Sequence, residues 1–329
     1  MNLARLGGLL RAHAGLELAL LGEKRVEVAA RRLAATLALE PSALPEALAL
    51  QPEALQALVE AVMVHETFFF RDEAAFDHLA GQAQAWRART GASPLRLLSL
   101  GCATGEEAYS AAITLLEAGL PADAFRVEAC DISAQAIAQA RAGVYRDRAF
   151  RSDRARSAAG RWCAPVPGGH RVGEVPRQAV CFHQANLNDP AWRPTYEGVD
   201  VIFCRNVLIY FEPLARARLL ERMAGWLATG GQLFAGHSEA TALADGFDPA
   251  GPRGSFVYRR RQGVAPVPAG RTPAPLAEPG PAQPRATPSV AADGVLGRLN
   301  RVAELERPAR RLRRRGALAA ARRPPSGGA

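Results

Sequence analysis

Residues 97–107 read Leu97-Leu98-Ser99-Leu100-Gly101-Cys102-Ala103-Thr104-Gly105-Glu106-Glu107. A short apolar run, typical of a buried strand, stops at a Gly-x-x-x-Gly turn, and an acidic pair then opens a helical pattern. A second apolar run further along ends on Asp131. In a Rossmann-like sheet such glycines let a nucleoside approach the backbone, and an acid at the end of the second strand binds the ribose hydroxyls. The pattern therefore predicts a nucleoside-binding α/β domain.

The acidic pair distinguishes between two kinds of nucleoside ligand. A dinucleotide-binding loop offers free backbone amides to a pyrophosphate at the helix N-terminus. Here Glu106 and Glu107 place negative charge at that point. Negative charge favours a ligand that carries an amino group or a sulfonium, so S-adenosylmethionine fits the sequence better than NAD.

The net charge of +9 is concentrated at the C-terminal end of the chain. From Arg261 onward there are 13 arginines and 4 acidic residues, whereas residues 1–260 hold 28 basic and 28 acidic residues. Because residues 1–260 have no overall basic character, we expect no nucleic acid partner.

The five cysteines are scattered without a C-x-x-C pair, and the six histidines lack metal-ligand spacing. This distribution indicates a reducing compartment and predicts no metal site. No apolar run approaches the roughly 18 residues of a membrane span, and no signal-peptide pattern is present. We therefore expect a cytoplasmic protein without membrane insertion.

Three parts follow one another along the chain. Residues 1–73 carry leucines and valines at helical spacing, which predicts a helical N-terminal domain. Residues 74–262 begin with a helix and then alternate strands and helices, which predicts a parallel, doubly wound sheet. Residues 263–329 begin with a proline-rich stretch and continue arginine-rich, so we expect a disordered linker and tail. The expected strands are 95–100, 125–130, 199–203 and 232–235, and the expected helices begin at Glu106, Ser133 and Pro213.

Residues 144–180 interrupt the alternation of strands and helices. This segment has no apparent helical period, is strongly basic, and contains three prolines and a Gly168-Gly169 pair. At this length we expect a small inserted subdomain instead of a plain loop.

Polar side chains follow the predicted strands at the edge where open parallel sheets bind ligands. Arg205, Asn206 and Tyr210 come after one buried strand, and Asn186 follows another. The alternative is a local role, with Asn206 satisfying a turn and Asn186 capping. The sequence Gly236-His237-Ser238-Glu239 lacks the G-x-S-x-G pattern, so it does not predict a hydrolase.

Three consecutive phenylalanines, Phe68 to Phe70, lie between polar residues just before the sheet domain. One interpretation is a domain junction that packs its aromatic rings. The other projects Thr67 and Arg71 into the cleft where the helical domain meets the sheet, a common place for a ligand.

Taken together, these segments resemble the chemotaxis receptor methyltransferases of CheR type. The resemblance covers roughly residues 1–260 and rests on five motifs in the family's order. The motifs are His65-Glu66-Thr67-Phe68-Phe69-Phe70-Arg71-Asp72, Gly101-Cys102-Ala103-Thr104-Gly105-Glu106-Glu107-Ala108-Tyr109-Ser110, Cys130-Asp131-Ile132, Ile202-Phe203-Cys204-Arg205-Asn206-Val207-Leu208-Ile209-Tyr210-Phe211 and Leu233-Phe234-Ala235-Gly236-His237-Ser238-Glu239.

The resemblance implies an S-adenosylmethionine-dependent enzyme that forms methyl esters on glutamate side chains of the cytoplasmic helices of chemoreceptors. It implies an N-terminal helical bundle, a Rossmann-like methyltransferase domain and a small β-subdomain at the 144–180 insertion. In some members that subdomain docks a receptor C-terminal peptide. We accordingly expect a monomer that associates with receptor arrays in the cytoplasm.

The resemblance also implies which residues form the site. Arg71 and Tyr210 lie nearest the transferred methyl and are the expected catalytic residues. His65 stands where many members have asparagine. The residues expected to bind the cofactor are His65, Thr67, Arg71, Gly101, Glu106, Asp131, Asn186, Leu187, Arg205 and Asn206.

A carboxylate needs no general base at neutral pH, because free glutamate has a pKa near 4.3. We therefore expect catalysis by alignment, with Arg71 orienting the substrate carboxylate. Two other functions stay open at this point. One is a methyltransferase for a small molecule or RNA, and the other is a non-catalytic scaffold that keeps the fold and binds receptors.

Overall fold

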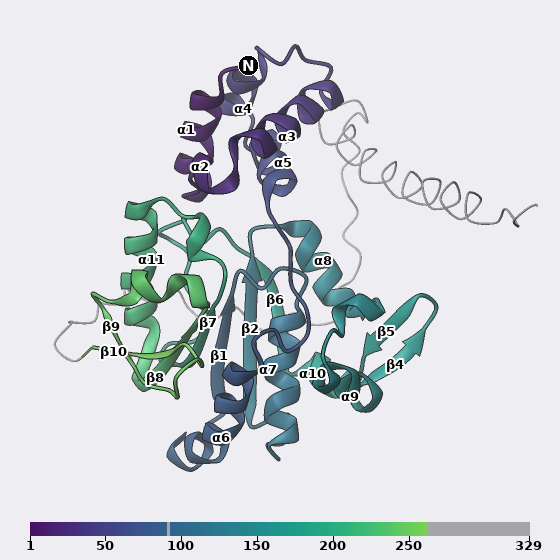
Figure 1. The fold of residues 1–329 in the computed structure, drawn as a ribbon, viewed down its shortest axis with the longest axis vertical. Helices are drawn as coiled ribbons and strands as arrows, with labels where there is room; N and C mark the ends of the chain where they lie inside the picture. The colour runs from purple at the N-terminus through teal and green to yellow at the C-terminus, as the bar shows by residue number, and fades with distance from the viewer. Residues whose placement is uncertain (91–92, 262–329) are drawn as a thin grey trace, which may run out of the picture.

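The computed structural model describes residues 1–90 and 93–261, so the expected linker and tail lie outside the described residues. Figure 1 shows a group of N-terminal helices above a central sheet, with a small separate sheet at one side. No helix among the described residues is long and apolar enough to cross a membrane.

The N-terminal helices form a bundle with its own apolar core, as the leucine and valine spacing predicts. The core combines residues from all five helices, including Leu6, Leu21, Val26, Leu48 and Leu58. The helices are α1 (Leu3–Ala14), α2 (Leu18–Leu21), α3 (Glu23–Thr36), α4 (Leu44–Leu50) and α5 (Pro52–Val62).

The central sheet has seven strands in the order β6-β2-β1-β7-β8-β10-β9. Strands β6, β2, β1, β7 and β8 are parallel, which confirms the Rossmann-like fold. The strands are β1 (Leu95–Leu100), β2 (Phe125–Asp131), β6 (Val180–Gln184), β7 (Val199–Cys204), β8 (Leu227–Ala235), β9 (Phe247–Pro249) and β10 (Val257–Arg260).

The sheet is parallel except at one edge. Strand β10 pairs antiparallel with both β8 and β9. Only residues 250–256 connect β9 to β10. A parallel crossover needs a longer connection, usually an α-helix, so β10 returns as a hairpin on β9 and fills the place between β9 and β8.

Both faces of the parallel sheet are covered. Along β1, Leu95 and Leu97 belong to one apolar core, and Leu98 and Leu100 belong to another. Successive strand residues point to opposite faces, so this alternation shows a doubly wound sheet. The helices that cover it are α6 (Glu73–Thr90), α7 (Glu106–Glu117), α8 (Ala134–Ala142) and α11 (Pro213–Trp226).

The insertion contains a three-stranded antiparallel sheet in the order β3-β5-β4, which confirms the expected β-subdomain. The expectation that it has no helical period is wrong. Helix α9 buries only alanines on its inner face, so its sequence shows no leucine or valine stripe. The elements are β3 (Val144–Tyr145), the 3-10 turn Asp147–Ala149, α9 (Asp153–Trp162), β4 (Cys163–Val166), β5 (Gly169–Val172) and α10 (Glu174–Gln178).

Candidate active site

The carboxyl ends of three neighbouring strands form the base of the site. Strand β1 pairs with β2 on one side and with β7 on the other. This brings together the turn at Gly101, the carboxylate of Asp131 and the Arg205-Asn206 pair. Gly101 has a φ of +68°, and a Cβ there would lie 2.4 Å from a methyl of Val207. Only glycine fits this turn without displacing its neighbour.

A cavity open to solvent lies between these strand ends and the segment that precedes α6, and the empty space within it, open solvent included, is about 460 Å³. Thr67, Arg71, Gly101, Arg205 and Asn206 all line it, as the sequence analysis expected them to meet at one site. The remaining lining residues are Val64, Glu66, Phe68, Phe76, Cys102, Ala103 and Glu107.

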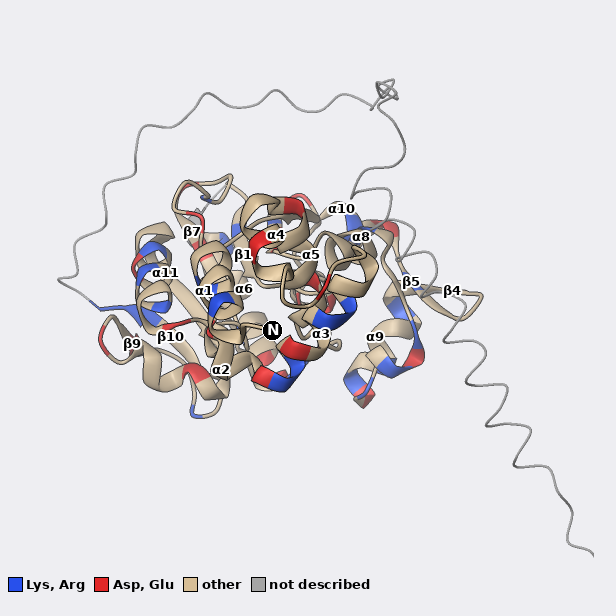
Figure 2. Ribbon diagram, turned by 90° about the horizontal axis from the view of Figure 1, so that it is seen from above, with Lys and Arg blue, Asp and Glu red and all other residues tan. Residues whose placement is uncertain are grey.

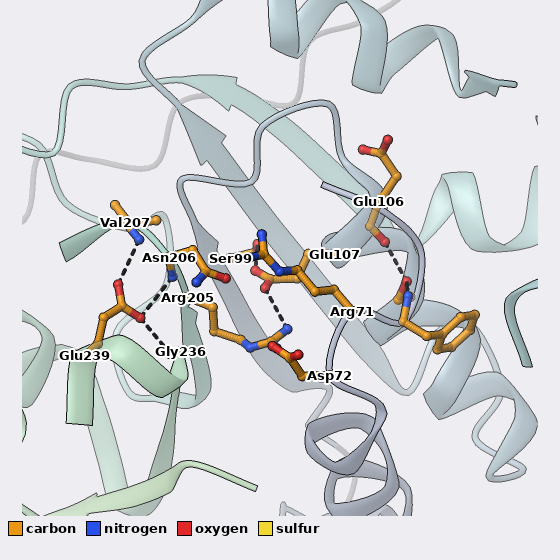
Figure 3. Close-up of polar contacts among 12 residues, drawn as sticks. Arg71, Asp72, Ser99, Glu106, Glu107, Arg205, Asn206, Val207, Gly236 and Glu239 are labelled. Carbon is orange, nitrogen blue, oxygen red and sulfur yellow. Dashed lines mark hydrogen bonds and ion pairs between the residues drawn. The ribbon is translucent and has the colours of Figure 1, made fainter. Parts of the chain in front are cut away.

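Arg205 is buried, and its charge is neutralised within the protein. Its Nη2 lies 2.5 Å from Asp72 Oδ2, and its Nη1 lies 3.3 Å from Glu107 Oε2. The guanidinium also lies over the ring of Phe76, 5.8 Å from its centroid. Figure 3 shows Arg205 bridging the two carboxylates. Arg205 therefore ties the segment before α6 to the start of α7.

Arg71 is in a different environment. Its Nη1 donates to the Glu66 carbonyl oxygen at 2.9 Å, and its guanidinium lies 5.9 Å from the Phe68 ring centroid. Within the described part of the chain, no carboxylate lies within ion-pair distance of Arg71. In Figure 3 its guanidinium extends toward Asn206 and Glu107. Arg71 thus brings a cation without a carboxylate partner into the cavity.

Asp131 closes the end of β2 and is held by two backbone amides. Ala103 N donates to Oδ2 and Ser133 N donates to Oδ1, both at 2.9 Å. Burial raises the pKa of its carboxyl, although these amides and His65 act in the opposite direction. His65 Nε2 lies 4.0 Å from Oδ1, which is too far for a direct hydrogen bond.

Two buried nitrogens at this site, His65 Nε2 and Arg205 Nε, have no hydrogen-bond partner in the described structure. A buried polar atom without a partner is costly and calls for an explanation. A ligand hydroxyl that bridges His65 and Asp131 would satisfy the first of them, and a ribose carries such hydroxyls. The residues present therefore fit a nucleoside at this end of β2.

The two adjacent glutamates at the start of α7 point in different directions. Glu107 Oε1 accepts a hydrogen bond from Ser99 Oγ at 2.8 Å, beside Arg205, and burial raises its pKa. Glu106 Oε2 accepts from Thr104 Oγ1 at 2.6 Å, and burial raises its pKa as well. Figure 3 shows the Glu106 carboxylate directed away from Arg205. Glu107 therefore lines the cavity, and the Glu106 carboxylate does not.

Five further expected site residues do not line the cavity: His65, Asp131, Asn186, Leu187 and Tyr210. Two of them, Asn186 and Tyr210, contact the N-terminal bundle. Asn186 Nδ2 donates to the His13 carbonyl oxygen at 2.6 Å, and its Oδ1 accepts from Asn188 N at 3.0 Å. Leu187 is buried in a core of the sheet domain. Tyr210 packs against the apolar core of the bundle.

A further carboxylate, Glu239, holds the loop that presents Asn206. It is 1% exposed and accepts hydrogen bonds from four backbone amides. Asn206 itself has a φ of +60°, an uncommon conformation that these bonds help to hold. The sequence of the Gly236 to Glu239 motif does not by itself predict this role. The four donors are Gly236 N at 2.6 Å, Val207 N and Leu208 N at 2.8 Å, and Asn206 N at 2.9 Å.

Apart from Val64, the residues that line the cavity fall within one protein-family match. A family model described as CheR methyltransferase, SAM binding domain, matches residues 65–250. The chain belongs to this family. The matched domain contains Arg71, Asp131 and Glu239, and its description confirms S-adenosylmethionine as the cofactor.

Curated relatives of this chain are named as methyltransferases. A probable biofilm formation methyltransferase WspC of Pseudomonas putida is 40% identical over 80% of this chain and 62% of its own length. The WspC of Pseudomonas aeruginosa is 38% identical over 77% of this chain and 60% of its own length. A chemotaxis protein methyltransferase 2 of Pseudomonas aeruginosa is 40% identical over 57% of this chain and 68% of its own length. The CheR-family chain thus spans less than two thirds of the WspC relatives it matches.

Proposed function

We propose that this CheR-family protein is an S-adenosylmethionine-dependent O-methyltransferase that forms methyl esters on glutamate side chains of chemoreceptor cytoplasmic domains. The family match and the relatives named as chemotaxis protein methyltransferases support the reaction class and the pathway. The proposed substrate places the protein in the cytoplasm beside receptor arrays, acting as a monomer.

The contrast between the two arginines of the cavity carries the proposal. Arg205 is paired with Asp72 and Glu107, whereas Arg71 has only a backbone carbonyl and an aromatic ring as partners in the described structure. A cation of this kind is suited to a substrate that brings its own carboxylate. A glutamate side chain meets that requirement, because a carboxylate oxygen accepts charge-assisted hydrogen bonds from a guanidinium.

The reaction needs alignment more than acid–base chemistry. When bound, S-adenosylmethionine supplies a methyl group on a sulfonium. The substrate carboxylate is already ionised at neutral pH, so the protein has no proton to remove from it. Arg71 would hold one carboxylate oxygen and leave the other free to react, which is an orientation effect. Phe68 and Phe76 lie on the cavity wall, where they would exclude water around the ion pair between Arg71 and the substrate carboxylate.

Docking of the receptor is proposed for the side of the molecule that carries the insertion. Figure 2 shows basic residues along α9 on the side that also holds β4 and β5. Arg146 and Arg148 are exposed there, while Arg151 and Arg154 contact Glu66 and Asp77. An acidic receptor helix bundle, with or without a C-terminal peptide on the β-subdomain, fits this surface by charge.

Transfer of a tritiated methyl group from S-adenosylmethionine to receptor-containing membranes tests the proposal. The WspC relatives are named for biofilm formation, so membranes of biofilm-forming cells of the source species are the first substrate to use. We expect label that mild base releases as methanol, the behaviour of a methyl ester. Cofactor binding by calorimetry without base-labile label would contradict this substrate class and favour a scaffold.

Substitution of Arg71 by lysine isolates its role. Lysine keeps the charge but not the two-nitrogen fork. We expect Arg71→Lys to lower kcat about 100-fold, the size of effect that a misplaced reactant produces, with little change in the affinity for receptor. Arg32→Lys, at an exposed position of α3, is the matched control and should retain activity. Full activity of Arg71→Lys would remove Arg71 from the mechanism.

A further inference from the structure

Arg71 has a carboxylate neighbour on its own segment of the chain. Its Nη1 donates to the Glu66 carbonyl oxygen at 2.9 Å, so the guanidinium lies beside the backbone of Glu66. Glu66 lines the same cavity, and its side chain is 65% exposed. A carboxylate on a long, exposed side chain can rotate toward a nearby cation, because opposite charges attract. An ion pair between Glu66 and Arg71 would occupy the charge that the proposed substrate needs.

The Glu66 carboxylate is paired with a different arginine in the structure. Arg151 Nη1 donates to Glu66 Oε1 at 3.3 Å, although the two residues are 85 positions apart in the sequence. Arg151 belongs to the insertion, residues 144–180. Arg71 thus holds the carbonyl oxygen of Glu66, while Arg151 holds its carboxylate. Within residues 1–90 and 93–261, this division leaves Arg71 without a carboxylate partner.

The position of Arg151 beside this segment is fixed by buried contacts of the two residues that precede it. Phe69 N donates to the Ala149 carbonyl oxygen at 2.9 Å. The Phe69 ring stacks on Phe150 with centroids 4.6 Å apart, and both rings are buried. Arg151 Nε also donates to the Arg148 carbonyl oxygen at 3.3 Å. The insertion is therefore packed against the segment that carries Arg71, and Arg151 is held within reach of Glu66.

Phe68 gives Arg151 a second contact on the same segment. The Arg151 guanidinium lies 4.4 Å from the Phe68 ring centroid, and the Arg71 guanidinium lies 5.9 Å from it. A guanidinium over an aromatic ring is attracted by the ring quadrupole. Both arginines therefore contact the same two residues, Glu66 and Phe68, and they compete for the one carboxylate among these groups.

The Arg151–Glu66 pair is exposed, which decides what kind of effect it has. The Arg151 side chain is 48% exposed, and exposed pairs contribute little to the stability of a fold. Where two cations compete for one carboxylate, however, even a weak pair changes the fraction of time for which the other cation is free. The expected effect is thus on the availability of Arg71 and amounts to a few-fold.

We propose that Arg151 is a positioning residue for the methyl-transfer reaction. By pairing with the Glu66 carboxylate, it keeps that carboxylate away from Arg71 and leaves Arg71 free for the carboxylate of the substrate. This inference rests on the proposed function, in which Arg71 binds the substrate carboxylate. Arg151 itself touches neither the substrate nor the cofactor, and it acts through Glu66.

Labelling of the full chain with phenylglyoxal, an arginine reagent, tests the proposal without any substrate. Mass spectrometry locates the modified residues. We expect the labelling rate of Arg71 to fall about three- to fivefold in Arg151→Gln, the size of effect of one exposed ion pair. The Arg151→Gln/Glu66→Gln variant should regain the wild-type rate, and Arg151→Lys should keep most of it, because lysine retains the cation. An unchanged rate in Arg151→Gln, or a fall that Glu66→Gln does not reverse, would overturn the proposal.

Arg148→Gln is the matched control for the loss of charge. Arg148 is exposed on the same insertion, and its side chain makes no ion pair with Glu66 in the described structure. The labelling rate of Arg71 should stay within about twofold in Arg148→Gln, because salt screens charges that are not in contact. An effect of Arg148→Gln equal to that of Arg151→Gln would contradict the specific pairing with Glu66.

Methyl transfer to receptor-containing membranes gives the second measurement. We expect kcat/KM to fall about three- to fivefold in Arg151→Gln and to recover in Arg151→Gln/Glu66→Gln, while the Kd for S-adenosylmethionine stays within about twofold. A weaker Kd that Glu66→Gln does not restore would assign Arg151 a structural role and contradict the proposal. A wild-type protein that transfers no methyl group would contradict the proposed function instead, and the labelling rates would still decide whether Arg151 keeps Glu66 from Arg71.

Discussion

Arg205 and Arg71 line the same cavity, but only Arg205 contributes its charge to the stability of the fold. The Arg205 side chain is 3% exposed and its partner Glu107 is 14% exposed, whereas its other partner, Asp72, is 55% exposed. Breaking a buried pair by removing one partner costs about 3–5 kcal/mol, and an exposed pair contributes under about 1 kcal/mol. The contact with Glu107 is therefore the one that stabilises the protein.

Substitution of Arg205 by methionine should lower the free energy of unfolding by about 2–4 kcal/mol, because Glu107 is left buried without a cation. Urea unfolding measures this. The Arg205→Met/Glu107→Gln double variant should recover a large part of the loss. Asp72→Asn is the control and should cost less than about 1 kcal/mol, since that pair is exposed. Equal losses for Arg205→Met and Asp72→Asn would contradict this assignment.

The buried carboxyl of Glu106 predicts a dependence of stability on pH. Burial raises its pKa, so the folded protein binds this proton more tightly than the unfolded chain does. The free energy of unfolding therefore falls as pH rises from the unfolded pKa through the folded pKa. Glu106→Gln removes this loss while keeping an oxygen to accept from Thr104 Oγ1.

Urea titrations at several pH values test this prediction. Glu106→Gln should unfold at a higher urea concentration than the wild-type protein at pH 7, and the difference should disappear near about pH 4, where both states are protonated. Asp123→Asn, a surface substitution on the same domain, is a suitable control. If Glu106→Gln raised the free energy of unfolding by the same amount at every pH, the effect would come from packing and not from ionisation.

The individual site residues were predictable only in part. The sequence shows that polar side chains follow the strands, so the meeting of Arg71, Gly101 and Asn206 at one cavity was predictable from topology. It does not show which of the two adjacent glutamates faces the cavity, because neighbouring residues on a helix point about 100° apart and the start of the helix sets the phase. Tyr210 likewise follows the right strand, but its ring packs against the bundle.

Strands were easiest to predict where they are buried on both faces. Strands β1 and β7 read as mostly apolar runs, as expected for the centre of a parallel sheet, and β2 is buried although Arg126 and Glu128 interrupt its apolar residues. Strands β9 and β10 are short and partly exposed, so no such run marks them. Helix α9 buries only Ala155, Ala158 and Ala159, and small side chains leave little periodicity to detect.

The turn after β1 gives a prediction that separates packing from backbone strain. Gly101→Ala places a Cβ 2.4 Å from Val207 Cγ2 and forces a φ of +68° on an alanine. We expect it to lower the free energy of unfolding by about 2–4 kcal/mol, from the clash and from the strained backbone together. Thermal unfolding followed by circular dichroism measures the loss.

Adding Val207→Ala to Gly101→Ala should restore the part of the free energy of unfolding that the clash removes. The part lost to backbone strain, about 1–2 kcal/mol, should remain. Gly81→Ala, on α6 with open space around the new methyl, is the matched control and should be neutral or stabilising. A Gly101→Ala protein as stable as the wild type would show that the turn adopts a different conformation.

The contacts between the N-terminal bundle and the sheet domain join segments that are far apart in the sequence. Glu17 N donates to the Tyr210 carbonyl oxygen at 2.9 Å, and Glu212 N donates to the Gly15 carbonyl oxygen at 2.8 Å. Gln56 Nε2 donates to the Ile132 carbonyl oxygen at 2.8 Å. No local pattern in the sequence predicts such hydrogen bonds, so the orientation of the bundle over the site was not predictable. Figure 1 shows its result, a cap of helices above the sheet.

Glu60 on α5 couples this cap to the ligand-binding edge of the sheet. Its Oε1 accepts from Ala134 N at 2.7 Å, and its Oε2 accepts from the Ser133 hydroxyl. Ser133 N in turn donates to Asp131 Oδ1 at 2.9 Å. A carboxylate of the bundle thus holds the start of α8, and through it the residue expected to bind the ribose.

Glu60→Ala should therefore loosen the start of α8 and weaken cofactor binding without unfolding the protein. A lost hydrogen bond to a charged group contributes about 1.5–3 kcal/mol, so the Kd for S-adenosylmethionine should rise about tenfold. Hydrogen exchange should accelerate at residues 133–137 and stay unchanged in β7. Glu53→Ala, an exposed residue of the same helix, is the control. Faster exchange without a change in Kd would show that the bundle stabilises the edge of the sheet but does not position Asp131 for the cofactor.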